Sequence, residues 1–137
     1  MRFEGSCQCG AVRYAFEAER LLGYLCHCRE CQHQSSSAFG MTVPMLADRL
    51  EWEGIPPHRW VRPAHSGRTT ACLFCPQCGS RLIHQDALTP TYCSVKAGGL
   101  DRAADVEIVG HLWAKRRIAG LGFVDQLAGA KRRKLTA

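Results

Sequence analysis

The chain has 137 residues, the length of one ordinary domain, and its 46% hydrophobic and 22% charged residues are typical of a soluble globular protein. No apolar run approaches the ~20 residues of a membrane span, and the N-terminus lacks the apolar core of a signal peptide. We therefore expect a soluble, cytoplasmic protein with no membrane partner.

Short apolar stretches separated by turn residues follow one another along the chain. In residues 11–17, Val12, Tyr14 and Phe16 alternate with other side chains, and a period of two predicts a strand with one buried face. Similar patterns predict strands over residues 21–25, 38–43, 49–52, 58–61, 67–74, 80–84, 92–96 and 106–113. Pro44 is expected to close one strand, and residues 29–37 to form a short helix or turns.

Many short strands with turn signals predict a mostly β domain of short antiparallel strands. We expect this single domain to cover residues 1–125, and residues 126–137 to form a basic, disordered tail. The formal net charge of +6 owes much to that tail, because residues 131–134 are all Lys or Arg. The domain itself is close to neutral once metal-bound thiolates are counted, so nucleic acid is not an expected partner.

Nine cysteines are a high number for this length. Because the number is odd, they cannot all pair in disulfides within one chain. Without an export signal, metal binding is the better use for them.

Three of the cysteines, Cys26, Cys28 and Cys31, lie within six residues. One metal ion can be reached by all three, and no fourth ligand is obvious nearby. Structural zinc sites have four protein ligands, whereas catalytic sites often keep a position open, so this group is the candidate reactive site. Two alternatives stay open, a closed site completed by a distant histidine and a set of redox thiols.

Two other pairs, Cys7-x-Cys9 and Cys75-x-x-Cys78, are each followed at once by glycine. Glycine tolerates the positive φ of a chain that turns back under a metal, and backbone N–H groups there can point at the sulfurs. We infer that these four cysteines close a structural zinc site, which gives two zinc ions per chain. Such a site would join distant segments and stabilise the fold.

Cys72 and Cys93 remain, each at an alternating position of a predicted strand. Free cysteine often packs there as a small buried hydrophobe, and the alternative is a fourth ligand or a reactive thiol. For His27, between two ligand cysteines, both a structural role and a proton shuttle stay open.

The charge of a three-thiolate site narrows its chemistry. Zinc with three thiolates has a formal charge of about −1, so it is a poorer Lewis acid than a histidine-bound ion and better suited to a soft ligand such as sulfur. A small-molecule thiol bound there would ionise near neutral pH and become a nucleophile.

Five motifs stand in order along the chain: GSCQCGAVRY at residues 5–14, CHCREC at 26–31, SAFG at 37–40, FCPQCGS at 74–80 and HLW at 111–113. In these motifs the sequence resembles the glutathione-dependent formaldehyde-activating enzyme family, which includes centromere protein V-like proteins. The resemblance implies a zinc-bearing β-tent fold with a structural zinc on Cys7, Cys9, Cys75 and Cys78 and a second zinc on Cys26, Cys28 and Cys31.

The activity that the resemblance implies is that of a carbon–sulfur lyase, the condensation of glutathione with formaldehyde to S-hydroxymethylglutathione. A small-molecule thiol and an aldehyde would then be its partners. The chain departs from the family's usual pattern at residues 32–36 and in the basic run 115–117, and either change could alter what binds beside the second zinc. His111, Phe39 and Trp113 could approach that site or belong to the core. The rival interpretations are a non-catalytic two-zinc binding module and a thiol carrier or sensor.

Overall fold

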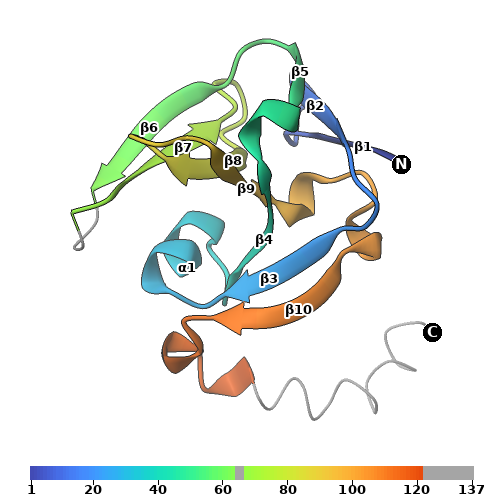
Figure 1. The fold of residues 1–137 in the computed structure, drawn as a ribbon. Helices are drawn as coiled ribbons and strands as arrows, with labels where there is room; N and C mark the ends of the chain where they lie inside the picture. Colours follow the sequence, from blue (N-terminus) through green and yellow to red (C-terminus); the bar gives the residue numbers. More distant parts are fainter. Residues whose placement is uncertain (64–66, 122–137) are drawn as a thin grey trace. The chain divides into compact units, whose positions relative to one another are not determined.

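The computed structural model describes residues 1–63 and 67–121. Its strands are β1 (Arg2–Ser6), β2 (Val12–Glu17), β3 (Leu22–Cys26), β4 (Gly40–Leu46), β5 (Glu51–Gly54), β6 (His58–Pro63), β7 (Thr69–Phe74), β8 (Arg81–Asp86), β9 (Tyr92–Lys96) and β10 (Glu107–Leu112). Helix α1 (Arg29–Ser35) and four 3₁₀ turns lie between the strands or after them, and Gly120 and Leu121 at the end of the described residues are also helical (Figure 1). The expectation of a mostly β protein is confirmed. The expected tail at 126–137 lies outside the described residues.

The described chain divides into two compact units. The first unit consists of residues 1–25 and 41–110, and it contains most of both β-sheets. The second unit consists of residues 26–40 together with the chain from His111 onward. The two groups of metal-type cysteines separate in the same way, because Cys7, Cys9, Cys75 and Cys78 belong to the first unit and Cys26, Cys28 and Cys31 to the second.

A three-stranded antiparallel sheet has the order β1-β2-β5. Strand β2 forms where the alternation of residues 11–17 predicts it. Strand β1 was not predicted, since Arg2–Ser6 has a single large apolar residue, Phe3, and only its pairing with β2 makes it a strand. Residues 47–49 form a 3₁₀ turn, so β5 begins two residues later than the predicted strand at 49–52.

A seven-stranded sheet has the order β10-β3-β4-β9-β8-β7-β6. The predicted strand over 92–96 is β9, and β8 returns antiparallel to β7 after the Cys75–Cys78 turn, as the sequence predicts. The expectation that Pro44 closes β4 is wrong, because the strand runs on to Leu46 with Pro44 opposite Ser94. A proline removes only one donor from a ladder, and the rest of the β4–β9 pairing holds the strand.

The core of the first unit lies between the inward faces of these strands, with Val12, Phe16, Leu82, Ile83 and Val95 almost fully buried. Tyr14 also packs there, directly over Gly5 on the neighbouring strand. A Cβ atom at Gly5 would lie 2.4 Å from Tyr14 Cζ, so the close contact of the two strands requires glycine at this position.

Helix α1 lies in the second unit. Its N-cap is Cys28, whose sulfur accepts a hydrogen bond from Cys31 N–H, and its C-cap is Ser36, in the left-handed conformation with φ 49°. The short helix predicted for residues 29–37 is therefore confirmed. Further along the chain, Trp113 has φ 55° and precedes a 3₁₀ turn at Ala114–Arg116.

Candidate metal centre

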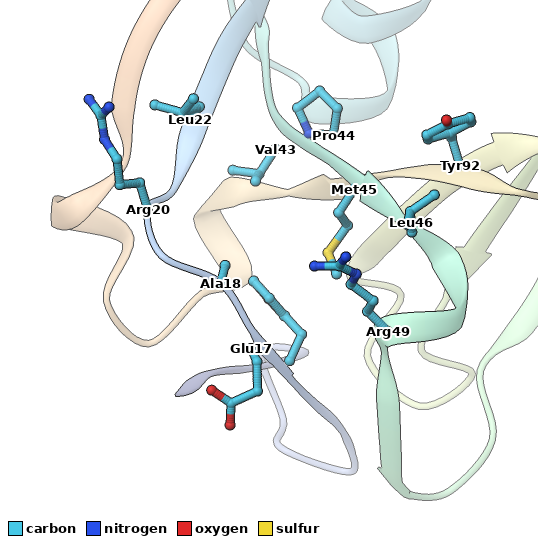
Figure 2. A pocket seen from close by; sticks show the side chains of 11 residues that line it. Glu17, Ala18, Arg20, Leu22, Val43, Pro44, Met45, Leu46, Arg49 and Tyr92 are labelled. Carbon is cyan, nitrogen blue, oxygen red and sulfur yellow. The ribbon is translucent and has the colours of Figure 1, made fainter. Parts of the chain in front are cut away.

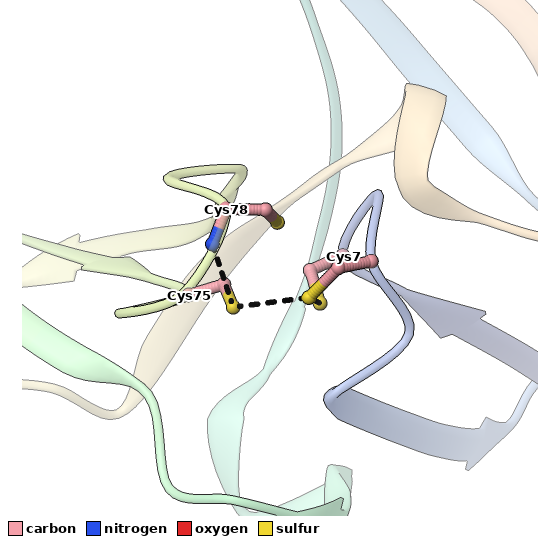
Figure 3. Close-up of side chains that lie close together, drawn as sticks. Cys7, Cys75 and Cys78 are labelled. Atoms are coloured by element: carbon pink, nitrogen blue, oxygen red, sulfur yellow. Dashed lines mark hydrogen bonds between the residues drawn. The ribbon is translucent and has the colours of Figure 1, made fainter.

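The first cysteine group joins the turn after β1 to the turn after β7. The sulfur atoms of Cys7, Cys9, Cys75 and Cys78 all lie within 4.8 Å of one another. The Sγ–Sγ distance is 3.6 Å for Cys7 and Cys9 and 3.8 Å for Cys9 and Cys75. Four thiolates at 2.3 Å around a tetrahedral zinc are about 3.8 Å apart, so this group fits a zinc ion. Figure 3 shows three of these side chains turned toward one another.

Backbone N–H groups surround the sulfurs of this first group. Val12 N lies 3.3 Å from the sulfur of Cys7, while Gln77 N and Cys78 N lie 3.3 and 3.5 Å from that of Cys75. The glycines after the two pairs adopt the positive φ that the sequence predicts, 79° at Gly10 and 80° at Gly79. These N–H groups stabilise negative charge on sulfur, which suits thiolates that share a cation.

Ser80 supports the same group from just after the second pair. Its hydroxyl oxygen lies 3.2 Å from Cys78 Sγ and accepts a hydrogen bond from Gln8 N–H at 2.9 Å. Hydrogen bonds from the Ser80 hydroxyl, from Ser80 N–H and from Cys9 N–H lower the pKa of the Cys78 thiol to about 5. Cys78 is thus held as the thiolate that metal binding requires. Sequence reasoning placed Ser80 in a motif without seeing this contact.

The second group contains Cys26 at the end of β3, Cys28 at the helix N-cap and Cys31 inside α1. Their sulfurs also lie within 4.8 Å of one another, with 3.6 Å between those of Cys26 and Cys28. These spacings fit a zinc ion as well. Within residues 1–63 and 67–121, no fourth His, Cys, Asp or Glu joins this group.

Gly40 leaves space beside the second group. A Cβ atom at this position would lie 3.2 Å from Cys31 Cβ and 3.4 Å from Cys31 Sγ. Any larger residue would therefore press on the third sulfur, which gives the SAFG motif at residues 37–40 a physical reason.

Hydrogen bonds fix the loop between Cys26 and Cys28. His27, which is 0% exposed, donates its backbone N–H to Leu112 O at 2.9 Å, and its Nε2 lies 2.9 Å from His111 Nδ1. The Gln32 side-chain amide donates to His27 O at 2.9 Å and to Arg116 O at 3.0 Å. Gln32 therefore ties the cysteine loop to the chain after β10 through two backbone carbonyls, of which that of His27 is buried.

His27 and His111 differ in their surroundings. Burial lowers the pKa of His27, and the positive charges of His111 and Arg117 act in the same direction. The ring faces Phe39 and His111, which supports the structural role that the sequence left open. His111 is exposed rather than in the core, and Trp113 is 66% exposed. The basic run 115–117 is exposed too.

Cys72 and Cys93 belong to neither group. Cys72 is 0% exposed on β7, and Cys93 packs in the hydrophobic core of the first unit. Burial raises the pKa of the Cys93 thiol to about 11, so this residue is a buried apolar side chain and not a nucleophile.

Two hollows of the described chain have linings that include no cysteine. A cavity of about 420 Å³ in the first unit is lined mainly by apolar side chains such as Leu22, Val43 and Met45, with Arg20 and Arg49 at its border (Figure 2). A smaller polar hollow of about 320 Å³ in the second unit is lined by Arg29, Gln32, His33, Ser36, Ser37 and Ile118. Its lining includes three residues of the segment 32–36, where the sequence is expected to depart from the family pattern.

The fold and the cysteine groups define a small, mostly β protein with two sites that could hold metal ions. The family model of the glutathione-dependent formaldehyde-activating enzyme matches residues 2–116, so the chain belongs to this family. A crystal structure of a Rhodobacter sphaeroides protein superimposes with a TM-score of 0.60 at 19% identity, covering 79% of this chain and 98% of that one. This second likeness concerns the fold alone.

No curated protein matches the chain. None of the helices in the described ranges has the length and apolar character needed to cross a membrane.

Proposed function

We propose that the chain is a zinc-dependent carbon–sulfur lyase that adds a low-molecular-weight thiol, such as glutathione, to a small aldehyde, such as formaldehyde. The observation that carries the proposal is the difference between the two cysteine groups. Four sulfurs gather in the first group and three in the second within the described chain. Structural zinc sites use four protein ligands, whereas a site with three keeps a position for substrate.

Each cysteine group would have a separate role in this proposal. Cys7, Cys9, Cys75 and Cys78 would hold a structural zinc, and Cys26, Cys28 and Cys31 would hold a second one. Zinc bound there would supply positive charge beside which a substrate thiol ionises near neutral pH. Gln32, through its bonds to His27 O and Arg116 O, and His27, through its bond to Leu112 O at the end of β10, would keep the three sulfurs in place.

In the forward reaction, the thiol sulfur forms a bond to the carbonyl carbon, the carbonyl π bond opens, and the proton that leaves sulfur ends on the former carbonyl oxygen. The reverse reaction breaks the carbon–sulfur bond and releases the aldehyde. Family membership supports this chemistry, since the family is named for a glutathione-dependent enzyme that activates formaldehyde.

Exchange spectroscopy by NMR tests the proposal. Formaldehyde and glutathione form their adduct unaided, so the measured quantity is the exchange rate at equilibrium with and without the zinc-loaded chain. We expect acceleration that is lost in Cys28→Ser. Serine is a good N-cap residue, so this variant should keep helix α1 while removing one sulfur.

Cys93→Ala is the matched control, because Cys93 belongs to neither cysteine group, and it should exchange as fast as wild type. Equal exchange rates with and without protein, for a chain that carries two zinc ions, would contradict the lyase proposal. Binding of glutathione without acceleration would instead indicate a thiol carrier.

A further inference from the structure

Strands β6 to β9 are neighbours in the seven-stranded sheet (Figure 1). Four basic side chains from these strands lie on one face of it. We call this the cationic face, and its members are Arg62, Arg81, His84 and Lys96. None of them was singled out from the sequence, since each is a lone charged or polar residue in a separate stretch.

The strand register places Arg62, His84 and Lys96 on the same side. Residues that face each other in an antiparallel pair point to the same face, and this face alternates along each strand. His84 is opposite Ser94, and Lys96 follows two residues later on the same strand. The opposite side of β8 and β9 carries Ile83 and Val95, which are in the core.

Arg62 joins the face from β6. Its register partner is Thr70, whose hydroxyl accepts a hydrogen bond from Arg62 Nη2 at 3.3 Å. Thr70 is opposite Asp86 on β8, and β7 also places Cys72 opposite His84. Thr70 and Cys72 are two residues apart and so point to the same side, which means that Arg62 and His84 lie on the same face of the sheet.

Arg81 joins the face beside a register irregularity, where its partner on β7 is Phe74. Its Nη1 lies 2.8 Å from His84 Nε2, and its guanidinium lies over the Trp60 ring at 5.9 Å from the centroid. No Asp or Glu of the described chain forms an ion pair with Arg81. Its contacts are thus an aromatic face and a histidine, neither of which balances its charge.

The contact between Arg81 and His84 also fixes the histidine tautomer. A guanidinium can only donate, so His84 Nε2 accepts and the ring proton lies on Nδ1. Burial lowers the pKa of His84 to about 2, and the charges of Lys96, Arg81 and Arg62 act in the same direction. His84 is therefore neutral at physiological pH and offers an N–H group.

The carboxylate of Asp86 lies in the same register row as Thr70 and Arg62 and is hydrogen-bonded to the turn after β8. Asp86 Oδ1 accepts hydrogen bonds from Leu88 N–H at 2.9 Å and Thr89 N–H at 3.0 Å. These bonds hold the turn after β8 and lower the pKa of Asp86, so its carboxylate is ionised at neutral pH. The cationic face thus presents the positive charges of its Arg and Lys side chains and the N–H group of His84, with the carboxylate of Asp86 in the same register row as Arg62.

We propose that the cationic face binds a small oxyanion, with Arg81 and the Nδ1–H group of His84 as the hydrogen-bond donors. The ligand is the carboxylate or phosphate group of a small molecule, since a guanidinium fork matches both. Arg62 and Lys96 also make contacts of their own, and the proposal uses only their charge. It requires neither a thiol nor an aldehyde, so it stands or falls separately from the lyase proposal.

NMR titration of the zinc-loaded full chain tests this proposal. Sodium malonate is added in one arm and inorganic phosphate in the other, with sodium chloride keeping the ionic strength constant. We expect saturable shifts of the His84 ring nitrogens and of the Trp60 indole N–H in at least one arm. Saturation by malonate alone assigns a carboxylate ligand, and saturation by phosphate alone assigns a phosphate ligand.

Arg81→Met should weaken this binding about tenfold or more, because it removes a charge-assisted hydrogen bond. Arg59→Met is the matched control, since Arg59 precedes Trp60 on β6 and its register partner is Leu73 rather than Cys72; it should leave the affinity unchanged. Absence of saturable shifts in both arms for the wild-type chain would overturn the proposal without any variant. Equal affinity in wild type and a folded Arg81→Met chain would overturn it too.

Discussion

The two cysteine groups use the same kind of ligand and differ in what surrounds it. In the first group, two turns contribute two sulfurs each, and backbone N–H groups contact the sulfurs of Cys7 and Cys75. In the second, three sulfurs come from one short segment, and side chains fix the loop between them. A closed set of ligands stabilises a fold, whereas an incomplete set leaves a coordination position for chemistry. Both groups use cysteine, and a backbone N–H group contacts sulfur in each, so the number of ligands, four against three, is the difference that would separate the two proposed roles.

The largest effect is expected from breaking the first group with Cys75→Ser. Cys75 is 0% exposed and lies in the group that joins the turns after β1 and β7. Structural zinc supplies about 10–16 kcal/mol in small zinc-dependent domains, so losing one of four ligands should lower the free energy of unfolding by about 4 kcal/mol or more. Urea unfolding with parallel measurement of zinc content checks this. An unchanged unfolding midpoint would show that the first group has no structural role.

Cys28→Ser breaks the second group and should affect a different property. We expect zinc content to fall from about two to about one per chain, while the free energy of unfolding changes by less than about 2 kcal/mol because the helix N-cap is kept. Metal analysis and urea unfolding of the same sample measure both. A loss of stability as large as that of Cys75→Ser would mean that both groups are structural.

Gln32→Ala sharpens the comparison without removing a sulfur. It deletes the donor to His27 O and Arg116 O, and loss of such an outer-shell partner weakens metal affinity about 10–100-fold. Competition with a chromogenic chelator should show faster zinc loss from the second group and unchanged retention in the first. The control is Gln34→Ala on the same helix, a residue whose side chain has no hydrogen bond within the described chain. Equal zinc loss in both variants would contradict the role of Gln32.

Ser80→Ala should give the smallest effect, confined to the first group. The Ser80 hydroxyl lowers the pKa of Cys78 through its hydrogen bond, so without it that pKa rises and protons compete better with zinc for the thiolate. Zinc release on acidification should therefore begin at a higher pH than in wild type. A pH titration of zinc release in the presence of a chelator measures this shift, and a shift to lower pH would contradict the account.

Much of the fold could be predicted from local pattern. Alternation in residues 11–17 and the apolar stretch 92–96 predict β2 and β9 because each strand has one face in the core. Strand β1 could not be predicted, since Arg2–Ser6 becomes a strand only through its pairing with β2. Pro44 misleads because a single missing donor does not end a strand whose neighbours supply the rest of the ladder.

The grouping of the metal-type cysteines could be predicted from their spacing, because pairs followed by glycine predict turns with the sulfurs on one side. The residues around them are harder to predict. Gln32 acts through backbone carbonyls of His27 and Arg116 that are close only after folding. The cationic face depends on strand register, which single charged residues in separate stretches do not reveal.

The most direct test of the central claim is X-ray absorption at the zinc edge, which counts the sulfur atoms bound per zinc with and without glutathione. With four sulfurs in one site and three in the other, the account predicts an average of about 3.5 sulfurs per zinc in the resting protein, rising to about 4 when the thiol occupies the open position. An average of 4 before any thiol is added, or a value that glutathione does not raise, would contradict an open second site.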